Sequence, residues 1–218
     1  MNPLIQTFLS GTWGTLALFG VTLIGCLIGG TILAAMRVSP VPILRGAAAA
    51  YVDVVRNTPL TLVMFFCVFG LPYLDIRFGS TAGMNSFVLA CIALTAYTSC
   101  FIAETLRSGI ATVPVGQAEA ARAVGLGFGQ VLGYVVLPQA FRTVIPPLGS
   151  VIIAMLKNTS IASAFNNREL ISAMRNAIEV RGDIVIPLLL ATALIYLVLA
   201  LGLGRVFAYL EKRMVILR

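Results

Sequence analysis

The chain has 218 residues, of which 59% are hydrophobic and only 11% are charged, with a net charge of +7 and no histidine. Soluble domains carry about 25% charged residues, so this composition excludes an ordinary soluble protein. The lysines and arginines stand singly at the ends of apolar runs, where they face lipid headgroups and water. Nucleic-acid binding would need them grouped on a polar face, so no nucleic-acid partner is expected.

Long uncharged runs predict an all-α integral membrane protein with about five transmembrane helices in a single domain, 1–218. A helix rises 1.5 Å per residue, so about 20 residues cross a hydrocarbon core of roughly 30 Å. The second run is short, and Pro146 and Pro147 interrupt the fourth. The expected spans cover residues 13–36, 59–73, 85–105, 138–156 and 184–204.

The stretch Ala123–Phe141 is also uncharged and allows a count of six spans, which would reverse the topology after it. Its four glycines, two glutamines and Pro138 favour a loop instead, although the pattern leaves both counts open. With five spans and the N-terminus outside, ten of the 15 lysines and arginines fall on the inner side. The positive-inside rule therefore favours an outer N-terminus and a cytoplasmic C-terminus.

The sequence offers no catalytic or metal site. The four cysteines lie in apolar runs without CxxC spacing, which is typical of small buried hydrophobic residues. Neither Lys157 nor Lys212, the only lysines, follows the glycines of a phosphate-binding loop, so the chain is expected to bind no nucleotide or other cofactor.

The segment Gly116–Phe141 begins like a soluble helix and then becomes glycine-rich. We expect a short helix at Gln117–Val124 with Glu119 in its first turn, where a carboxylate suits the helix dipole. Gly125 stands where a left-handed C-cap belongs, and Val131–Leu137 would start a second short helix. The loop 109–137 is therefore predicted to carry a helix–turn–helix on the cytoplasmic side.

This segment resembles the EAA motif of permease subunits in bacterial ATP-binding-cassette (ABC) importers, through Glu119–Ala121, Gly125 and Val135-x-Leu137-Pro138. "VRNTPL" (55–60), "AETLRSGI" (103–110) and "LKNTSIAS" (156–163) are similar to the polar amino-acid permeases of that superfamily. Within it, "MRVSPVPILR" (36–45) and "GQAEAARAVGLGFG" (116–129) look most like glutamate-uptake subunits.

The resemblance implies a type I ABC importer permease in the cytoplasmic membrane that transports a polar amino acid, with glutamate as the best guess. It implies an ATPase dimer that binds the ATP, an extracytoplasmic solute-binding protein and a second homologous permease, in a heterodimer rather than a homodimer. By resemblance, the residues that dock on the ATPase are Glu119, Ala120, Ala121 and Gly125.

A polar cluster at the end of the fourth span is a candidate substrate pathway, formed by Lys157, Asn158, Thr159 and Ser160. If the helix unwinds there, cations, hydroxyls and amides can meet the carboxylate and ammonium of an amino acid. The alternative is that Lys157 reaches the outer interface and Thr159 or Ser160 caps the next helix. Two other functions remain as alternatives to transport: a membrane-embedded enzyme, or a structural or channel protein with no ATPase partner.

Overall fold

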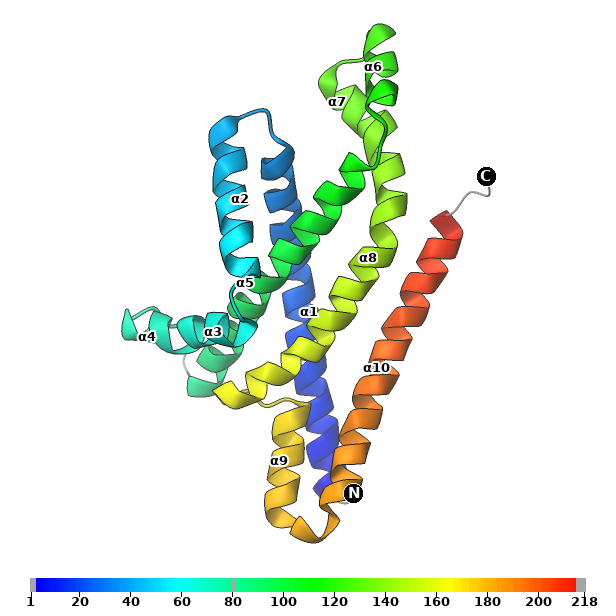
Figure 1. The fold of residues 1–218 in the computed structure, drawn as a ribbon. Coiled ribbons are helices and arrows are strands. Elements are labelled where there is room, and N and C mark those ends of the chain that lie inside the picture. Colours follow the sequence, from blue (N-terminus) through cyan, green and yellow to red (C-terminus); the bar gives the residue numbers. More distant parts are fainter. Residues whose placement is uncertain (1–2, 80, 215–218) are drawn as a thin grey trace.

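The computed structural model describes residues 3–79 and 81–214, and all of the regular structure in these residues is helical (Figure 1). Four helices are long and apolar enough to cross a membrane, and a bent helix pair raises the number to five. The expected all-α membrane fold is therefore confirmed. The α-helices are α1 Pro3–Val38, α2 Pro42–Arg56, α3 Leu60–Phe65, α4 Leu71–Tyr73, α5 Ala82–Ala111, α6 Val115–Ala123, α7 Phe128–Gln130, α8 Leu137–Asn158, α9 Leu170–Val180 and α10 Val185–Met214.

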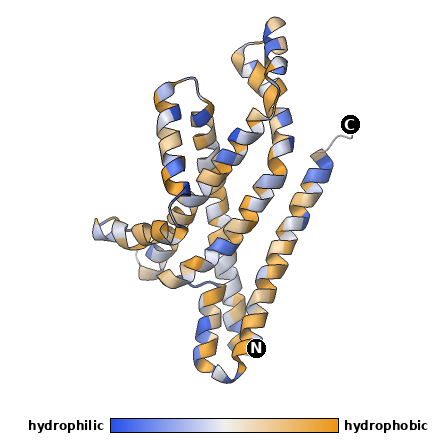
Figure 2. Ribbon diagram, in the orientation of Figure 1, coloured by the Kyte–Doolittle hydropathy of each residue, from blue (hydrophilic) through white to orange (hydrophobic). Residues whose placement is uncertain are grey.

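Helix α5 lies at the centre of the molecule and packs against α1, α2, α3 and α8. Its residues Leu89 and Leu94 are fully buried in an apolar cluster that also takes Leu18 from α1 and Met64 from α3. In contrast, only 11% of the most apolar window of α10 is buried. Hydrophobic residues dominate α10, and hydrophilic residues gather in α6, in α9 and near the C-terminal end of α10 (Figure 2).

The second expected span, 59–73, is too short to cross a membrane alone. Helix α2 runs back beside α1, and the helical run Leu60–Tyr73 then turns by 104°, so only the bent pair passes as one span. The bend falls at Pro59, whose backbone is extended (φ −58°, ψ 134°) and which favours extended backbone in the residue before it. The predicted boundary at Pro59 is thus present, but it divides one bent pair instead of starting an independent span.

Two π-helical segments, η1 (Phe66–Gly70) and η2 (Val131–Val136), each end directly before a Leu-Pro pair. Proline has no N–H to donate, and its ring clashes with the carbonyl four residues earlier. For both Pro72 and Pro138 that carbonyl lies within the π segment, where the wider turn makes room for the ring. The chain therefore stays helical through both prolines.

The fourth span is longer than the expected 138–156. Helices α7 and α8 are continuous through η2, and the 3₁₀-helix η3 (Thr159–Phe165) extends the run to Phe165. The second short helix expected at Val131–Leu137 is part of this run and not a separate element. The sixth span considered at 123–141 has no helix of its own, since α6 ends at Ala123 and a turn precedes Phe128.

The two ends of the molecule carry different elements. Helices α6 and α7 lie at the same end as the last turns of α10, whereas α9 and the start of α1 lie at the opposite end (Figure 1). Figure 1 also shows α3 and α4 lying crosswise to the long helices. The loop with the EAA-like segment is therefore remote from the start of the chain, as an odd number of crossings requires.

Candidate functional site

The helix–turn at Gly125 has the geometry expected from its sequence. The N–H of Leu126 donates to the carbonyl of Ala121 at 3.2 Å, and the N–H of Gly125 donates to that of Arg122 at 2.9 Å. Together these two bonds form a Schellman motif. Gly125 has φ +90°, a backbone conformation that side chains with a Cβ rarely adopt, so glycine is required here by the backbone.

Helix α6 packs against η2 and presents Glu119 and Ala120 to the surface, whereas Ala121 is buried. The helix begins at Val115, directly after Pro114, which is earlier than expected. Glu119 therefore lies beyond the first turn, and its predicted role there as a partner of the helix dipole was wrong. A contact between Gln139 of α8 and Gln117 fixes α6 to the long helix that follows.

Glu104 on α5 lies among three arginines near the end of α5 that leads to α6. Arg107 binds both carboxylate oxygens at 3.1–3.2 Å, Arg37 at the end of α1 binds at 3.1 Å, and Arg56 at the end of α2 lies at 3.8 Å. The pair with Arg107 was expected from the spacing of three residues. This group of four side chains, the Glu104 cluster, joins the ends of α1 and α2 to α5.

The segment Lys157–Ser160 is not unwound as expected, because α8 continues through Asn158 and then tightens into η3. Lys157 is exposed, whereas Thr159 is fully buried and its hydroxyl donates to Leu156 O at 2.6 Å. The hydroxyl of Ser160 likewise donates to Lys157 O at 2.7 Å. Both hydroxyls bind backbone carbonyls of their own helix, and neither Thr159 nor Ser160 caps the next helix.

The next helix, α9, is capped by Glu169, whose side chain is fully buried. Its carboxylate accepts hydrogen bonds from Ser172 N at 2.7 Å, Ile171 N at 2.9 Å and the Tyr196 hydroxyl of α10 at 3.1 Å. Burial raises the pKa of Glu169, and these three donors partly oppose that rise. On α1, Thr15 Oγ1 accepts the N–H of Leu170 at 3.0 Å. The Glu169 network therefore joins α1, α9 and α10.

Sequence reasoning missed Arg37 and Arg56 as partners of Glu104, and it missed the burial of Glu169. The positive end of α1 and the arginine of "VRNTPL" are visible in the sequence, but nothing in it shows that α2 folds back beside α1. A capping box at Glu169 and Ser172 was the one local signal for the start of α9.

The sequence pattern of one protein family, described as "Binding-protein-dependent transport system inner membrane component", matches residues 22–216. The chain is 44% identical to the glutamate transport system permease proteins of Corynebacterium efficiens and Corynebacterium glutamicum, over 96% of this chain and 95% of each relative. It is 36% identical to a probable glutamine ABC transporter permease protein of Bacillus subtilis, over 95% of this chain and 93% of that relative.

Solved structures show the same fold. One, described as an amino acid ABC transporter with histidines, superposes with a TM-score of 0.86 at 28% identity, over 96% of this chain and 94% of the other. An inward-facing MetNI methionine ABC transporter superposes with a TM-score of 0.76 at 18% identity, over 99% of this chain and all of that chain. The type I importer permease fold is therefore established. This chain belongs to the family of inner-membrane components of binding-protein-dependent transport systems.

Proposed function

We propose that the protein is the membrane subunit of an ATP-driven importer for an acidic amino acid, with glutamate as the substrate. The observation that carries this proposal is the 44% identity, over nearly the whole chain, to two permeases named for glutamate transport. The runner-up functions, a membrane-embedded enzyme and a structural or channel protein without an ATPase, have no comparable support.

As a member of this family the chain is a multi-pass protein of the cytoplasmic membrane that works with ATPase and solute-binding subunits. In our proposal the permease partner is a homologous sister chain and the N-terminus is outside. Helix α6 then lies in the cytoplasm and docks on the ATPase. Exposed Glu119 and Ala120 supply the contact, and the bond geometry at Gly125 fixes the corner behind them.

Docking of this kind would transmit motion from the ATPase to the long helices. Helix α6 follows α5 after only three residues, and the Gln117–Gln139 contact joins it to α8. A displacement of α6 therefore acts on two adjacent spans. When ATP brings two ATPase subunits together, the permease equilibrium shifts between inward- and outward-open states through these contacts.

Two measurements test the proposal. In a strain that lacks the gene, restored uptake of labelled glutamate, with competition by unlabelled amino acids, tests the substrate. Gly125→Val, which places a β-branched residue at φ +90°, should reduce uptake at least about tenfold while the chain still reaches the membrane. Gly116→Ala, a glycine of the same helix with φ outside the left-handed region and no atom within 4 Å of an added Cβ, is the matched control.

Retention of the ATPase on purification separates docking from folding. The wild type should retain it, and Glu119→Lys should lose it without loss of permease. Glutamate uptake at the wild-type rate in both Gly125→Val and Glu119→Lys would refute the docking role of α6. Uptake of other amino acids, but not of glutamate, would refute the substrate assignment alone.

A further inference from the structure

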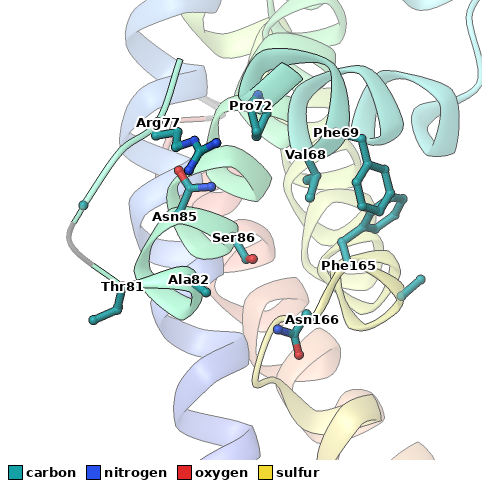
Figure 3. A pocket seen from close by; sticks show the side chains of 12 residues that line it. Val68, Phe69, Pro72, Arg77, Thr81, Ala82, Asn85, Ser86, Phe165 and Asn166 are labelled. Atoms are coloured by element: carbon teal, nitrogen blue, oxygen red, sulfur yellow. The ribbon is translucent and has the colours of Figure 1, made fainter. Parts of the chain in front are cut away.

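A cavity of about 560 Å³ lies beside the first turns of α5, on the half of the molecule farther from α6 (Figures 1 and 3). It is bounded by the loop before α5, by the crosswise η1–α4 segment and by the end of η3. Sites for small molecules usually measure 300–1,000 Å³, so the cavity has room for an amino acid.

One side of the cavity carries hydrogen-bond donors that no other described residue engages. In the described residues, 3–79 and 81–214, no hydrogen bond or ion pair engages the guanidinium of Arg77. The N–H of Phe78 donates to Asn85 Oδ1 at 2.7 Å. Because a backbone N–H can only donate, this bond identifies the oxygen of the Asn85 amide and leaves its NH₂ group to act as a donor.

The donors of the two residues are grouped. Figure 3 shows the side chains of Arg77 and Asn85 pointing toward one another, whereas the hydroxyl of Ser86, which also lines the cavity, points away from this pair. A guanidinium and an adjacent amide match the two oxygens of a carboxylate, since charged hydrogen bonds of this kind favour planar, bidentate geometry.

The charge of the cavity selects anions. Among the described residues that line it, Arg77 is the only charged one, and no aspartate or glutamate is among them. Arg181, directly after α9, is different because Asp183 binds it through two hydrogen bonds of 2.7 Å. The uncompensated cation at Arg77 therefore favours a ligand that carries negative charge.

The opposite side of the cavity is apolar. Phe69 and Phe165 line it, with ring centroids 5.9 Å apart, and Phe65 stacks edge-on against Phe165 at 4.9 Å. Phe165 is only 3% exposed, so this aromatic group separates the cavity from the interior of the protein. A ligand bound here contacts donors at one side and aromatic rings at the other.

We infer that this cavity is a binding site for the carboxylate of an acidic amino acid before it enters the membrane interior, with Arg77 and Asn85 as the carboxylate-binding residues. The inference rests on the proposed function, because it takes the transported amino acid as the ligand. It places the first contact at Arg77 rather than at Lys157–Ser160, whose hydroxyls are bound to their own backbone.

The test uses the complete complex in proteoliposomes, with ATPase, partner permease and solute-binding protein. Arg77→Cys should reduce the initial rate of glutamate uptake about fivefold, the effect of losing one exposed charge pair. A cationic methanethiosulfonate reagent should restore the rate, and an anionic reagent of similar size should not. Arg181→Cys, treated in the same way, is the matched control. The unsubstituted complex gives the background from Cys67, which is half-buried, and from three buried cysteines.

A second readout needs no transport. Glutamate at millimolar concentration should slow the modification of Cys at position 77 and leave modification at position 181 unchanged. Equal behaviour of the two cysteine variants, in uptake and in protection, would overturn the inference. If the unsubstituted complex takes up no acidic amino acid, the proposed function fails instead, and protection at position 77 would still report carboxylate binding.

Discussion

Two glutamates, one toward each end of the molecule, join neighbouring helices through different interactions. Glu104, toward α6, is bound by Arg107, Arg37 and Arg56 and is 20% exposed at its side chain. Glu169, at the opposite end, is fully buried, and its hydrogen bonds come from two backbone N–H groups and the Tyr196 hydroxyl. The same residue type therefore stabilises one end by opposite charges and the other by neutral donors and a helix N-terminus.

The difference has a mechanical consequence. Hydrogen bonds to backbone N–H groups fix the position of the Glu169 carboxylate. Helix α1 also packs closely against the chain just before Glu169, because a Cβ at Gly14 would lie 1.9 Å from the carbonyl oxygen of Arg168. The Glu104 cluster has more freedom, since Arg56 is 3.8 Å away and both Arg56 and Arg107 are 39% exposed at their side chains. We therefore expect the end near α9 to be rigid and the end near α6 to adjust during transport.

The largest effect is expected from Glu169→Ala. It removes the cap of α9 and leaves Ile171 N, Ser172 N and the Tyr196 hydroxyl without their acceptor. Each buried donor left without a partner costs about 1–3 kcal/mol, so the two backbone N–H groups of the lost cap should lower the unfolding free energy by about 4 kcal/mol. Thermal unfolding in detergent measures this loss.

Two further variants serve as controls. Tyr196→Phe, which removes one donor, should cost about 1 kcal/mol, and Glu179→Ala, which removes an exposed side chain from the same helix, should be nearly neutral. A Glu169→Ala variant as stable as Glu179→Ala would contradict this account of the end near α9.

The sequence predicts those features of the two ends that depend on residues close together in the chain. Hydropathy predicts the long helices because each span must satisfy the hydrogen bonds of its own backbone. The left-handed turn at Gly125 is also predicted from the residues beside it in the sequence. The spacing of Glu104 and Arg107 likewise predicts their pair. All of these are local signals.

The remaining features depend on contacts distant in sequence. Thr15 binds Leu170 across 155 residues, and Arg37 reaches Glu104 only because α1 packs along α5. The cavity at Arg77 is formed by the loop before α5 meeting the end of η3, which no local pattern reveals. The substrate pathway expected at Lys157–Ser160 stays a prediction. The sequence did not reveal that the hydroxyls of Thr159 and Ser160 donate to carbonyls of their own helix.

A smaller effect, but one that depends on salt, is expected for Glu104→Gln. The substitution leaves three guanidinium groups close together without a negative charge, and partial exposure limits the cost to about 2 kcal/mol. Added salt screens repulsion between charges, so the variant should recover part of its stability between low and high ionic strength. A second substitution, Arg107→Gln, should also restore part of it by lowering the excess charge.

The dependence of unfolding on ionic strength distinguishes the two ends more sharply than the size of the stability loss. The Glu169→Ala variant loses an acceptor whose partners are all neutral donors, so its thermal unfolding relative to the wild type should be insensitive to ionic strength. Equal salt responses of the Glu104 and Glu169 variants would show that the two ends are not held by different forces.

The smallest effect is the pH dependence of Glu169. Burial raises the pKa of this carboxyl in the folded protein above the value of about 4.3 for an unfolded glutamate. Between those two pKa values the folded chain binds more protons than the unfolded chain, so stability is fully present below about pH 4 and falls as pH rises through the folded pKa.

Glu169→Gln cannot titrate and should lack this decline. The difference in unfolding midpoint between the wild type and Glu169→Gln, measured from pH 4 to pH 7.5, should therefore be largest in acid and shrink toward neutral pH. Glu179→Gln, which removes an exposed carboxylate from the same helix, corrects for the change in net charge. If the wild type and Glu169→Gln have parallel pH profiles, burial does not control the titration of Glu169, and a charged carboxylate contributes to the stability of the end near α9.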